Sequence, residues 1–195
     1  AMPITDKKTL KKIISIAQGA MPADIVLKGC HIVDVINQRV IDGDIAIADG
    51  LIAGIGGPYV GVQEIDAQGG YAAPGLIDSH IHIESSYLTP EEFGRLLVPY
   101  GTTTVMADPH EIVNVCGLTG LEYMIRAAKH TVLDIKYMVP SCVPATDVDH
   151  AGASIDAADI RKALQWHGVA GLGEFMDYPH ILSCADSTLD KLVAA

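Results

Sequence analysis

Two histidines separated by one residue, His80 and His82, follow an apolar stretch in the segment PGLIDSHIHIESS, residues 74–86. If that stretch is a β-strand, alternate residues point to the same side, so the two imidazoles can face one point in space. Neutral imidazole is a common metal ligand. The spacing therefore predicts a metal site, and two unrelated loop histidines are the alternative.

Polar residues also follow two later strand-like stretches. The segment VMADPHEIVN places Asp108, His110 and Glu111 after residues 102–107, and GVAGLGEFMDYP places Glu174 at the end of another apolar stretch. In parallel α/β folds, reactive groups gather at the C-terminal ends of the strands. These four side chains are therefore candidate site residues. A helix cap at Asp108 and a salt-bridged rim position for Glu174 are the structural alternatives.

The elements that must position these residues alternate between strand and helix. Strands are expected near residues 75–80, 102–107, 135–140 and 168–173, and helices over 89–100, 118–130 and 154–167, with a further helix from 186. The repeat of about 30 residues fits one βαβ step. Such alternation predicts a parallel sheet with helices outside it. Residues 74–195 are thus predicted to form the N-terminal half of a (β/α)8 TIM-like barrel, in an α/β fold.

The region before residue 74 has a different pattern. Residues 1–20 are predicted to contain a short amphipathic helix. Residues 21–73 hold short runs of Ile and Val broken by Gly, Asp and Asn, with Asp-Gly pairs at 42–43 and 49–50. Asp-Gly pairs between apolar runs are typical of β-hairpins. A small antiparallel, β-sandwich-like subdomain is therefore expected to precede the barrel.

Composition excludes several classes of function. The 195-residue chain carries a formal net charge of −11, with 49% hydrophobic residues. Its Lys and Arg residues form no stripe, so we expect neither nucleic-acid binding nor adhesion to anionic lipid. No apolar run approaches the roughly 20 residues needed to span a bilayer. The four cysteines form no CxxC pair and are expected to be reduced, mostly buried thiols in a cytoplasmic protein.

Four segments together resemble a known family. IHIESS, GTTTVMADPHEIVNVCG, VPSCVPATD and GLGEFMDYP are similar to segments of the adenine deaminases of the amidohydrolase superfamily, and the resemblance covers about residues 24–185. The His-x-His pair is shared across the superfamily, whereas the DPHE block and Glu174 are more specific. Relatives such as the dihydroorotases have a carboxylated lysine where this chain has Glu174, which argues against a cyclic-amide hydrolase.

The resemblance implies metal-dependent hydrolysis of adenine to hypoxanthine and ammonia, and we expect the protein to form a homo-oligomer. It implies a binuclear centre of divalent metal, manganese or iron, in the full-length protein. The implied metal ligands are His80, His82 and Glu174, with Glu174 bridging the two ions. The implied catalytic residues are Glu174, Asp108, His110 and Glu111. The expected substrate-binding residues are Glu84, Ser85 and Ser86.

The family's remaining ligands come from later strands, beyond residue 195, so the chain is expected to be an inactive N-terminal fragment. Zinc nucleobase deaminases are excluded, because they need His-x-Glu followed by Pro-Cys-x-x-Cys, and PHEIVNVC lacks both features. Two alternatives stay open. One is another amidohydrolase acting on a cyclic amide or amidine, and the other is a non-catalytic metal-binding or assembly fragment.

Overall fold

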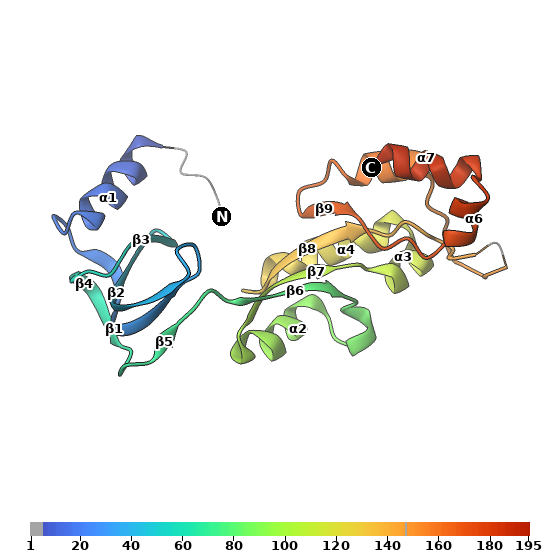
Figure 1. Ribbon diagram of the computed structural model, residues 1–195. Coiled ribbons are helices and arrows are strands. Elements are labelled where there is room, and N and C mark those ends of the chain that lie inside the picture. Colours follow the sequence, from blue (N-terminus) through green and yellow to red (C-terminus); the bar gives the residue numbers. More distant parts are fainter. Residues whose placement is uncertain (1–5, 147) are drawn as a thin grey trace. The chain divides into compact units, whose positions relative to one another are not determined.

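The chain forms two compact units, Ala1–Pro74 and Gly75–Ala195. The computed structural model describes residues 6–146 and 148–195 (Figure 1). The first unit begins with helix α1, Lys7–Ala17, which lies within the helical segment expected over residues 1–20. Residues 1–5 of that segment lie outside the described part of the chain. The Asp6 side chain caps α1 by accepting hydrogen bonds from the backbone N–H groups of Lys8 and Thr9, at 2.9 Å each.

One five-stranded sheet makes up the rest of the described first unit. Its strands are β1 (Ala23–Asp34), β2 (Arg39–Ala48), β3 (Leu51–Ile55), β4 (Gly61–Asp66) and β5 (Tyr71–Ala72). The order is β3-β2-β1-β4, and β5 also pairs with β1. The β1–β2 and β2–β3 pairs are antiparallel, as predicted, but β4 and β5 run parallel to β1. The prediction of a purely antiparallel sheet is wrong, because the chain crosses over after β3 instead of turning straight back.

The two Asp-Gly pairs have different roles. Asp49 and Gly50 form the tight turn between β2 and β3, both with positive φ, as a hairpin of this kind requires. The turn predicted at 42–43 is wrong, because Gly43 lies inside β2. A Cβ on Gly43 would lie 2.2 Å from the Gly56 carbonyl oxygen, so glycine is needed there for close backbone approach.

The second unit contains a four-stranded parallel sheet in the order β6-β7-β8-β9. The strands are β6 (Leu76–Ile81), β7 (Thr102–Ala107), β8 (Asp134–Val139) and β9 (Val169–Leu172). All three neighbouring pairs are parallel. The four strands and their direction, predicted from the sequence, are thereby confirmed.

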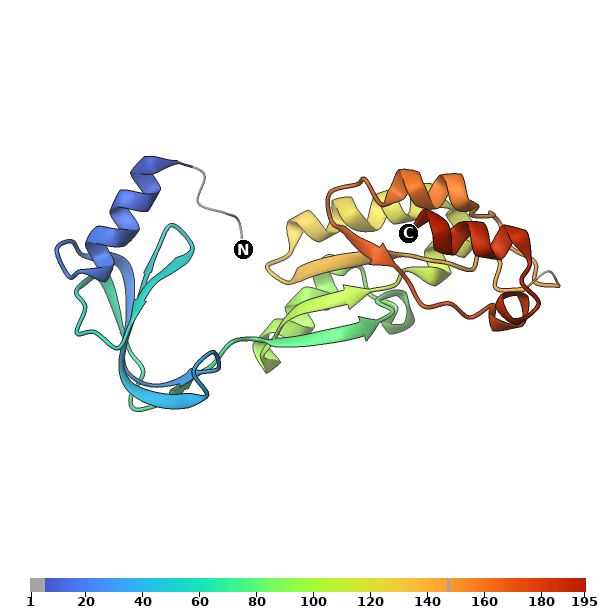
Figure 2. The ribbon, with the colours of Figure 1, turned by 45° about the horizontal axis from the view of Figure 1, so that its top comes forward.

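Helices connect and flank these strands (Figures 1 and 2). They are α2 (Pro90–Leu97), α3 (His110–Cys116), α4 (Leu118–Ala127), α5 (Ala157–Ala163), α6 (Tyr178–Leu182) and α7 (Asp186–Ala194), with 3-10 turns η1 (Glu84–Ser86), η2 (Val98–Tyr100) and η3 (Ala128–His130). The short helices α3 and α6 were not expected. Helix α5 begins later than the predicted residue 154, because Asp156 and Asp159 form a capping box at its start.

The core of the second unit lies between the sheet and the helices. Ile135, Tyr137 and Val139 alternate along β8 on one face and are buried against helical residues such as Leu121 and Ile160. This alternation is the period of two that a strand imposes.

The described residues contain no helix long and apolar enough to cross a membrane. All four cysteines are free thiols. Cys30 and Cys142 are buried, but Cys116 and Cys184 are exposed, so the expectation that the cysteines are mostly buried holds for only two of them.

Candidate metal centre

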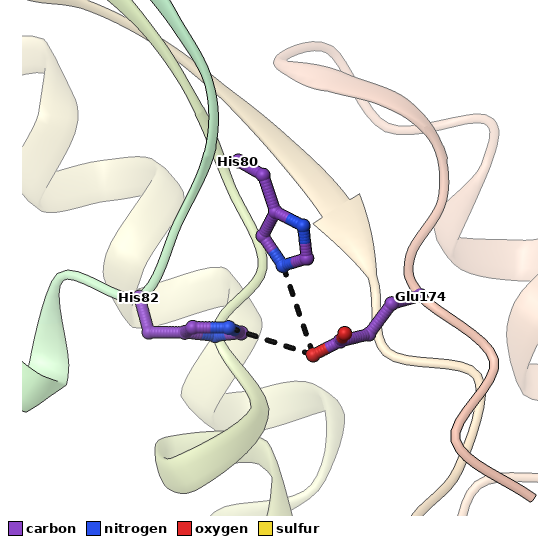
Figure 3. A group of neighbouring side chains, drawn as sticks. All are labelled: His80, His82 and Glu174. Atoms are coloured by element: carbon purple, nitrogen blue, oxygen red, sulfur yellow. Dashed lines mark ion pairs between the residues drawn. The ribbon is translucent and has the colours of Figure 1, made fainter.

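Three predicted ligands converge at the C-terminal ends of the strands (Figure 3). His80 lies in β6, His82 follows that strand, and Glu174 follows β9. Glu174 Oε1 lies 3.5 Å from His82 Nε2 and 3.7 Å from His80 Nε2. One ligand atom from each residue lies within 4.8 Å of the others. Glu174, which is about 90 residues away in sequence, is thus brought to the same point as the His-x-His pair.

The chemistry and spacing of these three groups fit a divalent metal ion. Two ligand atoms about 2.1 Å from one ion in tetrahedral geometry are about 3.4 Å apart, close to the separations seen here. His82 Nδ1 lies 2.7 Å from the Asp108 carbonyl oxygen. Since a carbonyl can only accept, Nδ1 carries the proton and Nε2 keeps its lone pair toward Glu174. Two imidazoles and a carboxylate suit zinc, manganese or iron.

A second group joins Glu174 to the DPHE segment. Ligand atoms of Asp108, His110 and Glu174 also lie within 4.8 Å of one another. Asp108 is 2% exposed and His110 is 9% exposed, and His110 Nδ1 lies 2.8 Å from Asp108 Oδ1. The two atoms are close, but their alignment does not make a hydrogen bond, and each is a buried polar atom without a hydrogen-bond partner. The site therefore has a buried side as well as an exposed one.

The protonation of His110 is set by opposing effects. Burial disfavours the charged imidazolium, but the carboxylates of Asp108, Glu174 and Glu111 together stabilise it more, so the pKa of His110 is raised above its usual value. Asp108 does not cap the following helix, because α3 has Pro109 at its N-cap position and no side-chain cap. The capping alternative for Asp108 is therefore wrong.

The remaining predicted residues lie where η1 meets α3. Ser85 Oγ donates to Glu111 Oε1 at 2.6 Å, and the Ile112 backbone N–H donates to Glu84 Oε1 at 3.3 Å. Burial raises the pKa of Glu84, and its Oε2 is buried without a hydrogen-bond partner. Ser86 Oγ donates to the Ile83 carbonyl. These contacts tie η1 to α3, and the substrate-binding role of Glu84, Ser85 and Ser86 stays a prediction.

A cavity of about 280 Å³ lies next to this group. It is lined by His110, Glu111, Asn114, Cys142, Ala145, Asp149, His150 and Met176. Asn114 and His150 were not singled out from the sequence, because neither directly follows a predicted strand. Ser141, after β8, was not singled out either, yet its hydroxyl donates to the Glu174 carbonyl oxygen.

Several known proteins with similar sequences are named adenine deaminase. The chain is 60% identical over 190 residues to adenine deaminase 2 of Desulfotalea psychrophila, covering 97% of this chain and 33% of that protein. It is 52% identical to the adenine deaminase of Ligilactobacillus salivarius over 97% of this chain and 33% of that protein. The chain therefore spans about a third of the length of these curated relatives.

Solved structures with a similar fold are more distant in sequence. An N-acyl-D-glutamate deacylase from Bordetella bronchiseptica, complexed with zinc and a phosphonate inhibitor, matches with a TM-score of 0.60 and 18% identity, over 90% of this chain and 43% of that one. Atrazine chlorohydrolase from Arthrobacter aurescens, complexed with zinc, matches with a TM-score of 0.54 and 15% identity, over 76% of this chain and 46% of that one. At these identities the likeness concerns the fold alone.

The family model described as the amidohydrolase family matches residues 71–193. That range holds all four strands of the parallel sheet together with the convergent histidines and Glu174. It covers more than half of the chain, and we conclude that the chain belongs to the amidohydrolase family.

Proposed function

We propose that the chain supplies part of the metal site of an adenine deaminase, an enzyme that hydrolyses adenine to hypoxanthine and ammonia. The observation that carries the proposal is the convergence of His80, His82 and Glu174 in a chain 43–60% identical to eight proteins named adenine deaminase. Because the chain spans a third of those proteins, the activity belongs to a longer protein. The chain alone is expected to have no turnover.

We further infer that the four parallel strands are the first half of an eight-stranded barrel. The support is the strand order β6-β7-β8-β9 and the position of the candidate ligands at the C-terminal ends of the strands. In barrels of this kind active sites lie at that face. A half-barrel contributes only half of the ligand-bearing strands, so the ligand set is expected to be completed by residues outside this chain.

The proposed resident metal is manganese or iron, as a pair of ions in the longer protein. His80 and His82 would hold one ion, and the two oxygens of Glu174 allow it to bridge to a second. When bound, the metal supplies Lewis acidity that makes water a better nucleophile near neutral pH. The two distant structural matches contain zinc, so the identity of the metal needs direct measurement.

The chain's own residues then have separable tasks. His82 is oriented by its bond to the Asp108 carbonyl, so that Nε2 faces the site. His110 and Glu111 line the adjacent cavity and are the candidates for holding or moving a proton at the substrate. Glu84, Ser85 and Ser86 are proposed to hold the substrate side of the pocket.

The deciding experiment measures ammonia release by a metal-loaded full-length protein that contains residues 1–195, beside the chain alone. Adenine, adenosine and dihydroorotate are supplied in parallel, and dihydroorotate opening is followed separately. We expect turnover of adenine by the full-length protein and none by the chain, with His82→Ala abolishing the activity. If the full-length protein opens dihydroorotate and does not deaminate adenine, the proposed activity is wrong and only the assignment to the amidohydrolase family stands. Turnover by the chain alone would show that the ligand set is already sufficient.

A further inference from the structure

Two buried side chains hold the backbone of Glu174, one at its N–H and the other at its C=O. The Glu174 backbone N–H donates to Asp108 Oδ2 at 3.0 Å, and Ser141 Oγ donates to the Glu174 carbonyl oxygen. Asp108 is 2% exposed and Ser141 is fully buried. Hydrogen bonds in such surroundings are shielded from water and electrostatically stronger than those at the surface. The residue whose carboxylate faces the two histidines is therefore fixed at both its N–H and its C=O.

Asp108 also holds the histidine side of the site. Its carbonyl oxygen accepts from His82 Nδ1 at 2.7 Å, and its N–H donates to the Ile81 carbonyl at 2.9 Å. Asp108 follows β7, which is a neighbour of β6 but is separated from β9 by β8. A single residue thus links ligands from two strands that do not pair with each other.

The adjoining backbone is shaped for this contact. A Cβ on Gly173 would lie 2.1 Å from Asp108 Oδ2, so any side chain at that position would have to displace the Asp108 carboxylate or the backbone. The Gly173 N–H donates to the Val139 carbonyl at 2.7 Å, which holds the end of β9 against β8. Glycine at 173 therefore allows the Asp108 carboxylate to reach the Glu174 N–H.

We propose that Asp108 and Ser141 are positioning residues that set the direction of the Glu174 carboxylate toward His80 and His82. The inference rests on the proposed role of Glu174 as a metal ligand. The Glu174 side chain is about one-third exposed, so its own packing constrains it weakly. Groups that orient metal ligands typically change metal affinity about 10–100-fold when removed. Asp108, with its carboxylate directed at a backbone N–H, acts through Glu174 and not on the substrate.

The first test reads the Glu174 peptide directly in the metal-free chain, by amide hydrogen exchange. Asp108→Ala should speed exchange of the Glu174 amide at least about tenfold, because the carboxylate oxygen that accepts from this N–H is removed. Asp108→Asn keeps an oxygen acceptor and should restore most of the protection. Ser141→Ala should also speed this exchange, since the backbone of Glu174 is then held only at its N–H.

Two control variants separate positioning from general destabilisation. Ser183→Ala removes a serine hydroxyl that donates to a backbone carbonyl away from the site, and Ile160→Val removes one carbon from the fully buried core. Both should leave Glu174 exchange within about twofold of the original chain. Equal acceleration by Ile160→Val and Ser141→Ala, or no acceleration by Ser141→Ala, would overturn the proposal.

The second test measures Mn²⁺ affinity of the same variants by electron paramagnetic resonance. Ser141→Ala should weaken binding about tenfold, and both controls should stay within about twofold. Unchanged affinity in Ser141→Ala would overturn the positioning role. A chain with no measurable Mn²⁺ binding would contradict the proposed metal site. In that case, amide exchange in the metal-free chain would still decide whether Asp108 and Ser141 hold the backbone of Glu174.

Discussion

Replacing Glu174 with glutamine removes one negative charge from the candidate metal centre and changes the side-chain shape little. Glu174 Oε1 lies 3.5 Å from His82 Nε2 and 3.7 Å from His80 Nε2, so the carboxylate is placed to contact any ion held by both rings. The backbone contacts of residue 174 with Asp108 and Ser141 do not involve the side chain and should persist. We therefore expect the fold to be retained and metal binding to weaken.

The size of the effect follows from the charge and exposure of the site. The side chains of His80 and Glu174 are 50% and 36% exposed, so the dielectric of water is the appropriate limit for a lower bound. Unit charges about 4 Å apart then interact by about 1 kcal/mol, and a divalent cation with a carboxylate by about 2 kcal/mol. Loss of about 2 kcal/mol of attraction in Glu174→Gln corresponds to an increase of about 30-fold in the Mn²⁺ dissociation constant.

The assay is a Mn²⁺ titration of the original chain, Glu174→Gln and Glu122→Gln, with circular dichroism to verify the fold. Glu122 is an exposed carboxylate in α4, so the same substitution there should leave the dissociation constant within about twofold. Equal affinity of Glu174→Gln and the original chain, with both folded, would refute the assignment of Glu174 as a ligand.

Three further outcomes are expected. Burial alone would raise the pKa of Asp44, but its 2.6 Å contact with Lys28 and two backbone N–H donors lower that pKa overall. The resulting stabilisation is present above about pH 4 and is lost as the pH falls. In chemical denaturation across pH, the unfolding free energy of Asp44→Asn should therefore fall less steeply at acid pH than that of the original chain. Gly173→Ala should cost about 1–3 kcal/mol of unfolding free energy, and an unchanged denaturation midpoint would show that the backbone relaxes freely. The exposed Ile77 on edge strand β6 should promote self-association, seen by light scattering as a mass above that of one chain, and Ile77→Lys should reduce that mass.

The parallel sheet could be predicted from the sequence because its strands are apolar runs with regular spacing and polar residues at their ends. Strand periodicity was enough to predict that the His-x-His pair faces one point. The rule that reactive groups follow parallel strands was enough to predict Glu174 as a site residue. Helices α3 and α6 were missed because they span 7 and 5 residues, too few to show a helical period. Short helices depend on tertiary contacts more than on local sequence.

The contacts between strand ends could not be predicted. The Asp108–Glu174 hydrogen bond joins residues 66 positions apart, and no local pattern reports which buried carboxylate meets which N–H. Gly43 was assigned to a turn because Asp-Gly pairs favour turns. It lies inside a strand, where the nearby Gly56 carbonyl leaves no space for a side chain. In both cases the contact that explains the residue comes from another segment of the chain.

The position of a bound ion tests the central claim most directly. Crystals of the chain soaked in Mn²⁺ should show one anomalous difference peak between His80 Nε2, His82 Nε2 and Glu174 Oε1, at partial occupancy because the ligand set is incomplete. A peak held by Asp108 and His110 without the His-x-His pair would contradict the account, as would two fully occupied ions or no peak at a saturating concentration.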